Sequence, residues 1–165
     1  MKFIETFFWG AFIACTALIA QVFVTVISEI FFKTTLTFQY LLTDTIIHVS
    51  LLMLIAATIE ELLRYLIIKK RISIYVSGLL TSLIYGIALG IGFASFETFL
   101  ALAGHTISLN ILFMMVPIFV IHIILSIFLL FFIKSKVKPI LELHYLIISI
   151  VLHTIGNLII FHFLT

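Results

Sequence analysis

The chain has 165 residues, of which 64% are hydrophobic and 10% are charged, and its mean hydropathy is +1.41. This composition excludes a water-soluble globular domain and predicts an all-α, polytopic helical membrane protein. A formal net charge of +2 gives no reason to expect a nucleic-acid partner. The single cysteine, Cys15, excludes an intrachain disulfide and a cysteine-based metal site.

Apolar stretches long enough to cross a bilayer account for most of the chain, since one crossing takes about 20 residues. We expect five transmembrane helices, at residues 3–28, 41–68, 84–104, 109–133 and 140–163. The first is expected to be a retained span, because its apolar run continues well past any signal-peptide cleavage site. The sequence therefore predicts one transmembrane domain, residues 1–165, in the cell membrane, without a separate soluble domain.

The third apolar stretch, residues 72–103, is too long for one straight crossing at a rise of about 1.5 Å per residue. We expect it to be broken near Gly86, so that the crossing itself occupies residues 84–104. Gly86, Gly90 and Gly92 then predict a thin helix face that neighbouring backbones approach closely.

Lysine and arginine are distributed unevenly between the predicted loops. With the amino terminus inside, the cytoplasmic segments hold Lys2, Lys69, Lys70, Arg71, Lys134, Lys136 and Lys138. The opposite side holds only Lys33. Because positive residues favour cytoplasmic loops, this bias predicts a cytoplasmic amino terminus and, with five spans, a carboxyl terminus outside.

Three ionisable residues, Glu60, Glu61 and Arg64, interrupt the second apolar stretch. Each such group costs about 2.5–3.5 kcal/mol at the centre of a membrane helix, so the three are expected to be paired, in a wet cavity, or both. On a helix, Arg64 lies within reach of both carboxylates. The alternative is an ion cluster whose charges reach the headgroups, but the two glutamate side chains are too short to follow the arginine there.

Four further polar side chains lie deep in apolar stretches: Glu97, His122, His153 and Asn157. Counted from the cytoplasmic ends at about 1.5 Å per residue, they and Glu60 lie about 12 to 26 Å deep, in the inner half of the membrane. A lone intramembrane histidine or asparagine often serves only to hold helices together. Ionisable groups on four different helices are harder to explain as packing, and they favour one shared site.

This set of side chains suits hydrolysis. A carboxylate can act as general base for water, histidine or asparagine can donate to a developing oxyanion, and Arg64 can hold a carboxylate ionised and oriented. No serine has a nucleophile context, and Asp44 is the only aspartate, which excludes aspartyl-type catalysis. A zinc site built from Glu60 or Glu61 with Glu97, His122 and His153 stays open, although the spacing His-Glu-x-x-His is absent.

The candidate residues form four motifs in chain order: Glu60-Glu61-x-x-Arg64, Phe93-x-x-x-Glu97, His122 and His153-x-x-x-Asn157. This pattern resembles the CAAX-protease and bacteriocin-processing (CPBP/Abi) superfamily of intramembrane proteases, and most closely its PrsW branch. The resemblance covers residues 59–157 and implies that Glu60 activates water while His153 and Asn157 bind the oxyanion. The first two motifs depart from those of the CAAX prenyl proteases, so a prenylated substrate is not implied.

We therefore expect an intramembrane endopeptidase that cleaves a membrane-anchored peptide or protein within the lipid bilayer. The expected catalytic residues are Glu60, Glu61, Arg64, Glu97, His122, His153 and Asn157. No resident metal or other cofactor is expected. PrsW-like proteins commonly have more spans, so this chain is either a minimal core or assembles with a partner subunit or with copies of itself. The competing hypotheses are a zinc protease with the same residues and a non-enzymatic proton-coupled carrier or scaffold subunit.

Overall fold

The computed structural model describes residues 2–32, 44–103, 109–134 and 139–164. These residues form no strand and five long helices, α1 (Lys2–Phe32), α2 (Asp44–Ile67), α3 (Leu79–Leu102), α4 (Leu109–Lys134) and α5 (Pro139–Leu164). A single π-helical turn, Ile68–Ile72, and a short 3₁₀ turn, Ser73–Tyr75, follow α2. The expectation of an all-helical architecture is confirmed.

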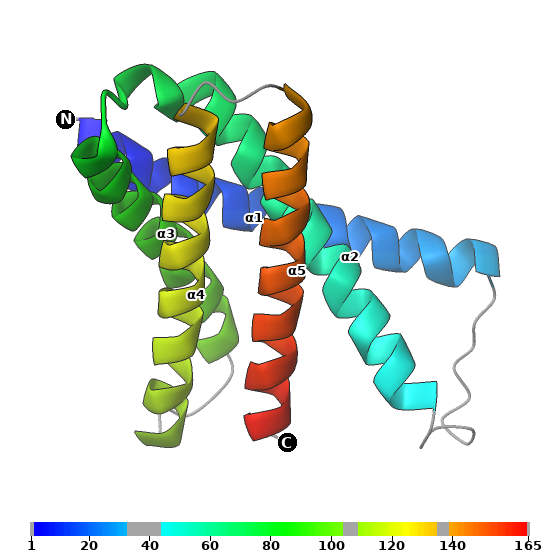
Figure 1. The fold of residues 1–165 in the computed structure, drawn as a ribbon. Coiled ribbons are helices and arrows are strands. Elements are labelled where there is room, and N and C mark those ends of the chain that lie inside the picture. Colours follow the sequence, from blue (N-terminus) through cyan, green and yellow to red (C-terminus); the bar gives the residue numbers. More distant parts are fainter. Residues whose placement is uncertain (1, 33–43, 104–108, 135–138, 165) are drawn as a thin grey trace.

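The helices form a bundle in which α1 packs on α3, α3 on α4, and α2 on both α1 and α5. In Figure 1, α4 and α5 run side by side, while α1 crosses behind them at a steep inclination. The core between the helices is apolar and includes Ile13, Leu89, Phe93 and Leu129. The bundle therefore brings α1, α3 and α4 together around one apolar core.

The break expected near Gly86 is wrong. Helix α3 runs without interruption from Leu79 to Leu102, and the chain turns earlier, at residues 76–78. The turn is stabilised by Thr81, whose Oγ1 accepts hydrogen bonds from the backbone N–H groups of Ser77 and Gly78, both at 2.9 Å. The π-helical and 3₁₀ turns that precede α3 account for the excess apolar length, so a helix break at Gly86 is not needed.

The glycines of α3 serve close packing, as expected. A side chain at Gly90 would place its Cβ 2.5 Å from Ile123 Cα of α4, and Gly86 also faces α4. Gly92 faces α1 instead, where a Cβ would overlap the carbonyl oxygen of Phe7. Gly10 of α1 makes the reciprocal approach to α3, so the two helices touch backbone to backbone where they cross.

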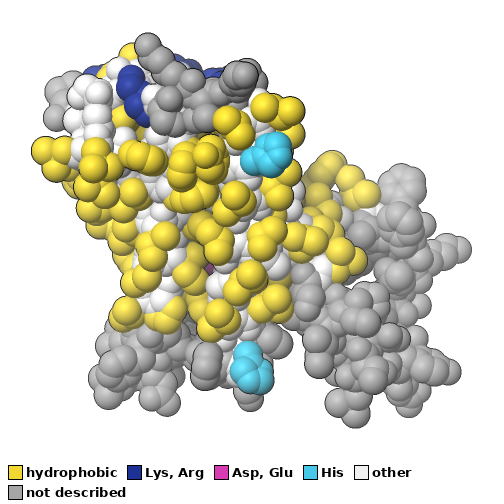
Figure 2. All heavy atoms as spheres, in the orientation of Figure 1, with side chains coloured by type: hydrophobic (Ala, Val, Ile, Leu, Met, Phe, Trp, Pro, Cys, Tyr) yellow, Lys and Arg dark blue, Asp and Glu magenta, His cyan; other side chains and the backbone are white. Residues whose placement is uncertain are grey.

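The positively charged segments lie on one side of the bundle. Lys2 Nζ donates to Tyr75 Oη at 2.9 Å, and Lys69 Nζ donates to the Glu142 carboxylate at 2.6 Å. The hydrogen bond to Glu142 raises the pKa of Lys69 above its ordinary value, so this lysine stays charged. Figure 2 shows lysine and arginine side chains gathered at this end. The positive residues that the structure describes thus share one side of the bundle, and the assignment of that side to the cytoplasm stays a prediction.

Four helices of the described chain carry a segment that is long and apolar enough to cross a membrane: residues 2–24, 79–100, 115–134 and 140–160. Large apolar side chains are exposed on their outer faces, such as Ile124 on α4 and Ile159 on α5, and they cover most of the described surface in Figure 2. The chain is a multi-pass membrane protein. The remaining long helix, α2, is the one that carries Glu60, Glu61 and Arg64.

Candidate active site

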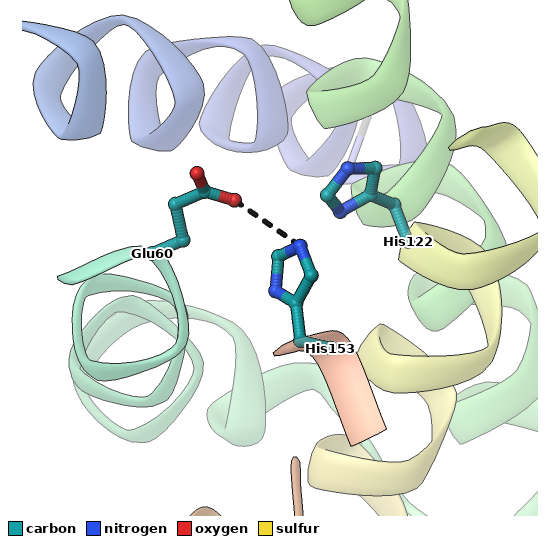
Figure 3. Close-up of side chains that lie close together, drawn as sticks. All are labelled: Glu60, His122 and His153. Carbon is teal, nitrogen blue, oxygen red and sulfur yellow. Dashed lines mark ion pairs between the residues drawn. The ribbon is translucent and has the colours of Figure 1, made fainter. Parts of the chain in front are cut away.

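Helices α2, α3, α4 and α5 bring the predicted polar residues together inside the bundle. Figure 3 shows Glu60, His122 and His153 pointing toward one another from three different helices. These three side chains are buried, as are Glu61 and Arg64. The side chain of Glu97 on α3 is 39% exposed and forms the outer edge of the group.

Glu61 is held through both of its carboxylate oxygens. Oε1 accepts hydrogen bonds from Arg64 Nη1 and, at 2.8 Å, from His153 Nδ1, and Oε2 accepts one from Ser149 Oγ at 2.6 Å. Because a carboxylate only accepts, the Nδ1 atom of His153 carries a proton. Glu61 therefore fixes the orientation of the histidine ring, and the other ring nitrogen, Nε2, points into the site.

Glu60 has one oxygen engaged and one free. Its Oε1 accepts a hydrogen bond from Gln21 Nε2 of α1 at 2.7 Å. Its Oε2 lies 3.4 Å from His153 Nε2, a contact that is an ion pair when the histidine is protonated (Figure 3), and neither of these buried atoms makes a hydrogen bond to a described residue. Buried polar atoms are almost always satisfied, so this pair marks the place for a water molecule or another small ligand.

His122 connects Arg64 to Glu97. Arginine only donates, so its Nη2 donates to His122 Nδ1, at 2.8 Å, and the histidine proton lies on Nε2. That Nε2 then donates to Glu97 Oε2 at 2.5 Å. Phe93 packs against the Arg64 guanidinium and the His122 ring, with its centroid 4.6 Å from Arg64 Cζ and 4.2 Å from the His122 centroid. Hydrogen bonds thus link four side chains in one continuous row: Glu61, Arg64, His122 and Glu97.

Sequence reasoning missed two residues and named one that stands apart. Ser149 lies one turn before His153 on the same helix face, which is the signal that it accompanies that histidine. Gln21 is the only amide side chain in the first apolar stretch. Asn157 lies one turn beyond His153, is half-buried, and has no hydrogen bond to the cluster among the residues described.

A cavity of about 260 Å³ adjoins the side chains of Glu60 and Glu97. Its lining residues come from α1, α2 and α3: Ala14, Leu18, Gln21, Glu60, Phe93, Phe96, Glu97 and Leu100. Most of the wall is thus apolar, and the polar groups are gathered at the catalytic end. Mostly apolar walls with a few placed polar groups are typical of substrate pockets.

The family model described as "PrsW family intramembrane metalloprotease" matches residues 2–162 of the chain. The chain belongs to the PrsW family. It is therefore an intramembrane protease, which favours hydrolysis over the carrier and scaffold alternatives. The PrsW resemblance of the motifs is confirmed, and the wider CAAX-protease superfamily stays a prediction. No curated protein and no solved structure matches the chain.

The PrsW family description implies a metal, and Glu60, His122 and His153 offer three donor atoms within 4.8 Å of one another. Two of them suit this role. Oε2 of Glu60 makes no hydrogen bond to a described residue. His153 donates a hydrogen bond from Nδ1 to the Glu61 carboxylate, as metal-binding histidines do. His122 does not suit it, because its Nδ1 accepts a hydrogen bond from Arg64 and its Nε2 donates to Glu97, which leaves neither ring nitrogen with a free lone pair. The donor set thus presents only two of three zinc ligands in the required form.

Proposed function

We propose that this PrsW-family chain is an endopeptidase that cleaves a membrane-anchored peptide or protein with a water molecule activated by Glu60. The observation that carries the proposal is the buried pair of Glu60 Oε2 and His153 Nε2, which lie 3.4 Å apart without a hydrogen bond to a described residue, on a glutamate that lines a cavity. A water beside this pair would contact both atoms.

The contacts of the two adjacent glutamates favour Glu60 over Glu61 as the base. Both oxygens of Glu61 are occupied by Arg64, His153 and Ser149, so a substrate water would have to displace one of them. Glu60 lines the cavity, its Oε2 accepts no hydrogen bond from a described residue, and Gln21 holds its other oxygen in place. A general base must lie within hydrogen-bond reach of the proton that it takes, and only Glu60 meets this requirement without rearrangement.

The buried charges favour a proton on His153 Nε2. Glu60, Glu61 and Arg64 together leave one uncompensated negative charge, and a net charge is costly to bury. A second proton on His153 cancels it. The ring can then donate from Nε2 into the site while Nδ1 remains bound to Glu61.

The reaction follows from these positions. The peptide carbonyl oxygen accepts from His153 Nε2, and the water oxygen attacks the carbonyl carbon while one water proton moves to Glu60 Oε2. The carbonyl oxygen takes up the negative charge, which the imidazolium stabilises. Glu60 then gives its proton to the amide nitrogen as the C–N bond breaks, which releases an amine and a carboxyl end. A second oxyanion donor, Asn157, is assigned from the motif resemblance alone.

The remaining site residues act by positioning. Arg64 holds Glu61 directly and His122 through its second nitrogen, and His122 in turn holds Glu97 at the cavity edge. Because Arg64 is buried, its loss would leave carboxylates uncompensated, an arrangement that destabilises proteins strongly.

A zinc-dependent mechanism with the same residues is the second candidate. It is favoured by the proximity of the donor atoms of Glu60, His122 and His153 and by the wording of the family description. In that case a bound zinc ion would supply the positive charge and polarise the water. His122 would first have to release Arg64 and turn a lone pair to the site.

The test uses purified protein in lipid vesicles and a panel of membrane-anchored peptides. Glu60→Gln preserves the shape and should lower cleavage about 100-fold to 10,000-fold, which is the usual effect of losing a general base. Glu142→Gln, which changes a carboxylate outside the site, is the matched control and should cleave normally. A strong chelator should leave the rate unchanged. Loss of cleavage with chelator and its return with added zinc would replace this mechanism by the metal-dependent one.

A further inference from the structure

Two hollows follow one another along α1 on the side that faces α3. The outer groove has a volume of about 660 Å³, and residues 5–15 of α1 supply all of its lining except Phe96. The inner cavity is the one of about 260 Å³ beside Glu60 and Glu97, and its α1 lining lies within residues 14–21. Phe96 lines both hollows, so they adjoin at this side chain.

The hollows arise from the way the two helices cross. Gly10 of α1 and Gly92 of α3 let the backbones touch at one point. Helices that cross at an angle separate on both sides of their contact, and in Figure 1 α1 is steeply inclined to α4 and α5. The space that opens between them leads toward Gln21 and Glu60, which are hydrogen-bonded to each other and both line the inner cavity.

We propose that the substrate is an apolar peptide segment that reaches the site from the bilayer between α1 and α3. It lies along the outer groove and places one bulky apolar side chain, next to the scissile bond, in the inner cavity. This inference rests on the proposed endopeptidase function and adds a substrate class and a specificity pocket to it.

The chemistry of the two hollows selects a peptide. Apart from Glu5, the walls of the outer groove are aromatic and apolar, with Phe8, Trp9 and Phe12 among them. The inner end presents two carboxylates, which need hydrogen-bond donors. A lipid chain could fill the outer groove but brings no donor to the inner end, whereas a peptide brings both apolar side chains and backbone N–H groups.

The volume of the inner cavity sets the size of the side chain. A cavity of about 150 Å³ holds a benzene molecule, so about 260 Å³ admits one side chain of the size of leucine or phenylalanine together with the reacting water. The carboxylates of Glu60 and Glu97 repel an acidic side chain at this position. We therefore expect the substrate to carry a bulky apolar residue beside the cleaved bond and no aspartate or glutamate there.

Leu18 of α1 is the residue that tests the pocket. It lines the inner cavity but is 38% exposed, so its replacement does not remove a core side chain. Leu18→Trp narrows the cavity and Leu18→Ala widens it. The neighbouring Ile19 is 65% exposed and does not line the cavity, so Ile19→Trp and Ile19→Ala are the matched controls.

The experiment compares anchored peptides that differ only beside the cleaved bond, which is first mapped with the wild-type protein. The wild type should cleave the leucine and phenylalanine peptides about tenfold or more faster than the alanine and aspartate peptides, a typical discrimination for an apolar pocket. Leu18→Trp should slow the phenylalanine peptide by about the same factor and leave the alanine peptide within about threefold. Leu18→Ala should improve a tryptophan peptide. Both Ile19 variants should keep the wild-type order.

The outcomes separate the pocket from the activity. If the wild type cleaves no peptide of the panel, the endopeptidase proposal fails. If it cleaves but the Leu18 and Ile19 variants have the same order of preference, the pocket is overturned and the activity stands.

A second readout needs no cleavage. Cys15 lines the outer groove, so in the Glu60→Gln protein a bound peptide should slow its reaction with a membrane-permeant thiol reagent. If Cys15 reacts equally slowly in vesicles with and without peptide, the groove is occupied by lipid, and the proposed occupant is overturned.

Discussion

The two adjacent glutamates should respond in opposite ways to the same substitution. Glu61→Gln removes the negative charge that faces the buried Arg64 and the hydrogen-bonded Ser149 and His153. Breaking a buried ion pair from one side typically costs about 3–5 kcal/mol of unfolding free energy. For a chain of this length that corresponds to a Tm lower by about 6–20 °C, at about 2–4 °C per kcal/mol.

Glu60→Gln should affect catalysis and leave stability nearly intact. The new amide oxygen can still accept from Gln21, Oε2 makes no hydrogen bond to a described residue, and His153 can release the second proton that balanced the Glu60 charge. The free energy of unfolding should therefore change by no more than about 1.5 kcal/mol, the net value of one hydrogen bond. Thermal unfolding in detergent and cleavage in vesicles measure the two effects on the same preparations.

Glu142→Gln serves as the control for the comparison, because its partner Lys69 is largely exposed and such pairs contribute about 0–1 kcal/mol. The reasoning would be refuted if Glu61→Gln unfolded at the same temperature as Glu60→Gln. It would also be refuted if Glu60→Gln kept its activity while Glu61→Gln lost it without loss of stability, because Glu61 would then be the base.

Three further predictions concern packing, support of the site, and topology. Gly90→Leu should prevent α3 from packing on α4, since its Cβ would already lie 2.5 Å from Ile123 Cα. The free energy of unfolding should fall by about 1–3 kcal/mol or more. Ile87→Leu, at an exposed position of the same helix, is the control. Ser149→Ala removes one hydrogen bond to the Glu61 carboxylate and should lower the free energy of unfolding by about 1.5–3 kcal/mol. Chemical denaturation measures this change. Normal stability would show that Glu61 does not need this donor. In a Cys15→Ser background, cysteines placed beside Lys70 and Lys136 should be labelled from the cytoplasm and one at Thr106 from outside; labelling of all three from one face would contradict five spans.

Much of the fold follows from apolar runs and charge alone, and the wrong prediction of a helix break near Gly86 has a local cause. The bounds of α4 and α5 lie within one residue of the apolar stretches expected there. The break near Gly86 was wrong because a glycine in an apolar run signals either a helix end or a close helix contact, and the sequence alone does not distinguish the two. Here a Cβ at Gly86 would lie 2.7 Å from Ile127 Cα, so contact is the reason for the glycine.

The residues of the candidate site could be predicted where an ionisable side chain interrupts an apolar run. Glu60, Arg64, Glu97, His122 and His153 all stand out in this way, and the structure brings them together. Ser149 does not stand out, because an isolated serine is ordinary in a membrane helix. The assignment of each oxygen and nitrogen to a partner also lay beyond the sequence, since it depends on helix rotation and on tertiary contacts.

Helix α1 shows why the motifs alone do not make the site. The motif pattern covers residues 59–157 and contains every charge of the cluster, yet one oxygen of Glu60 is held by Gln21, which lies outside that range. The same helix supplies Ala14 and Leu18 to the inner cavity and nearly all of the outer groove. It reaches these positions because Gly10 and Gly92 let it cross α3 at contact distance. The ion cluster therefore provides the chemistry, and α1 provides both a support for the base and the wall against which a substrate would lie.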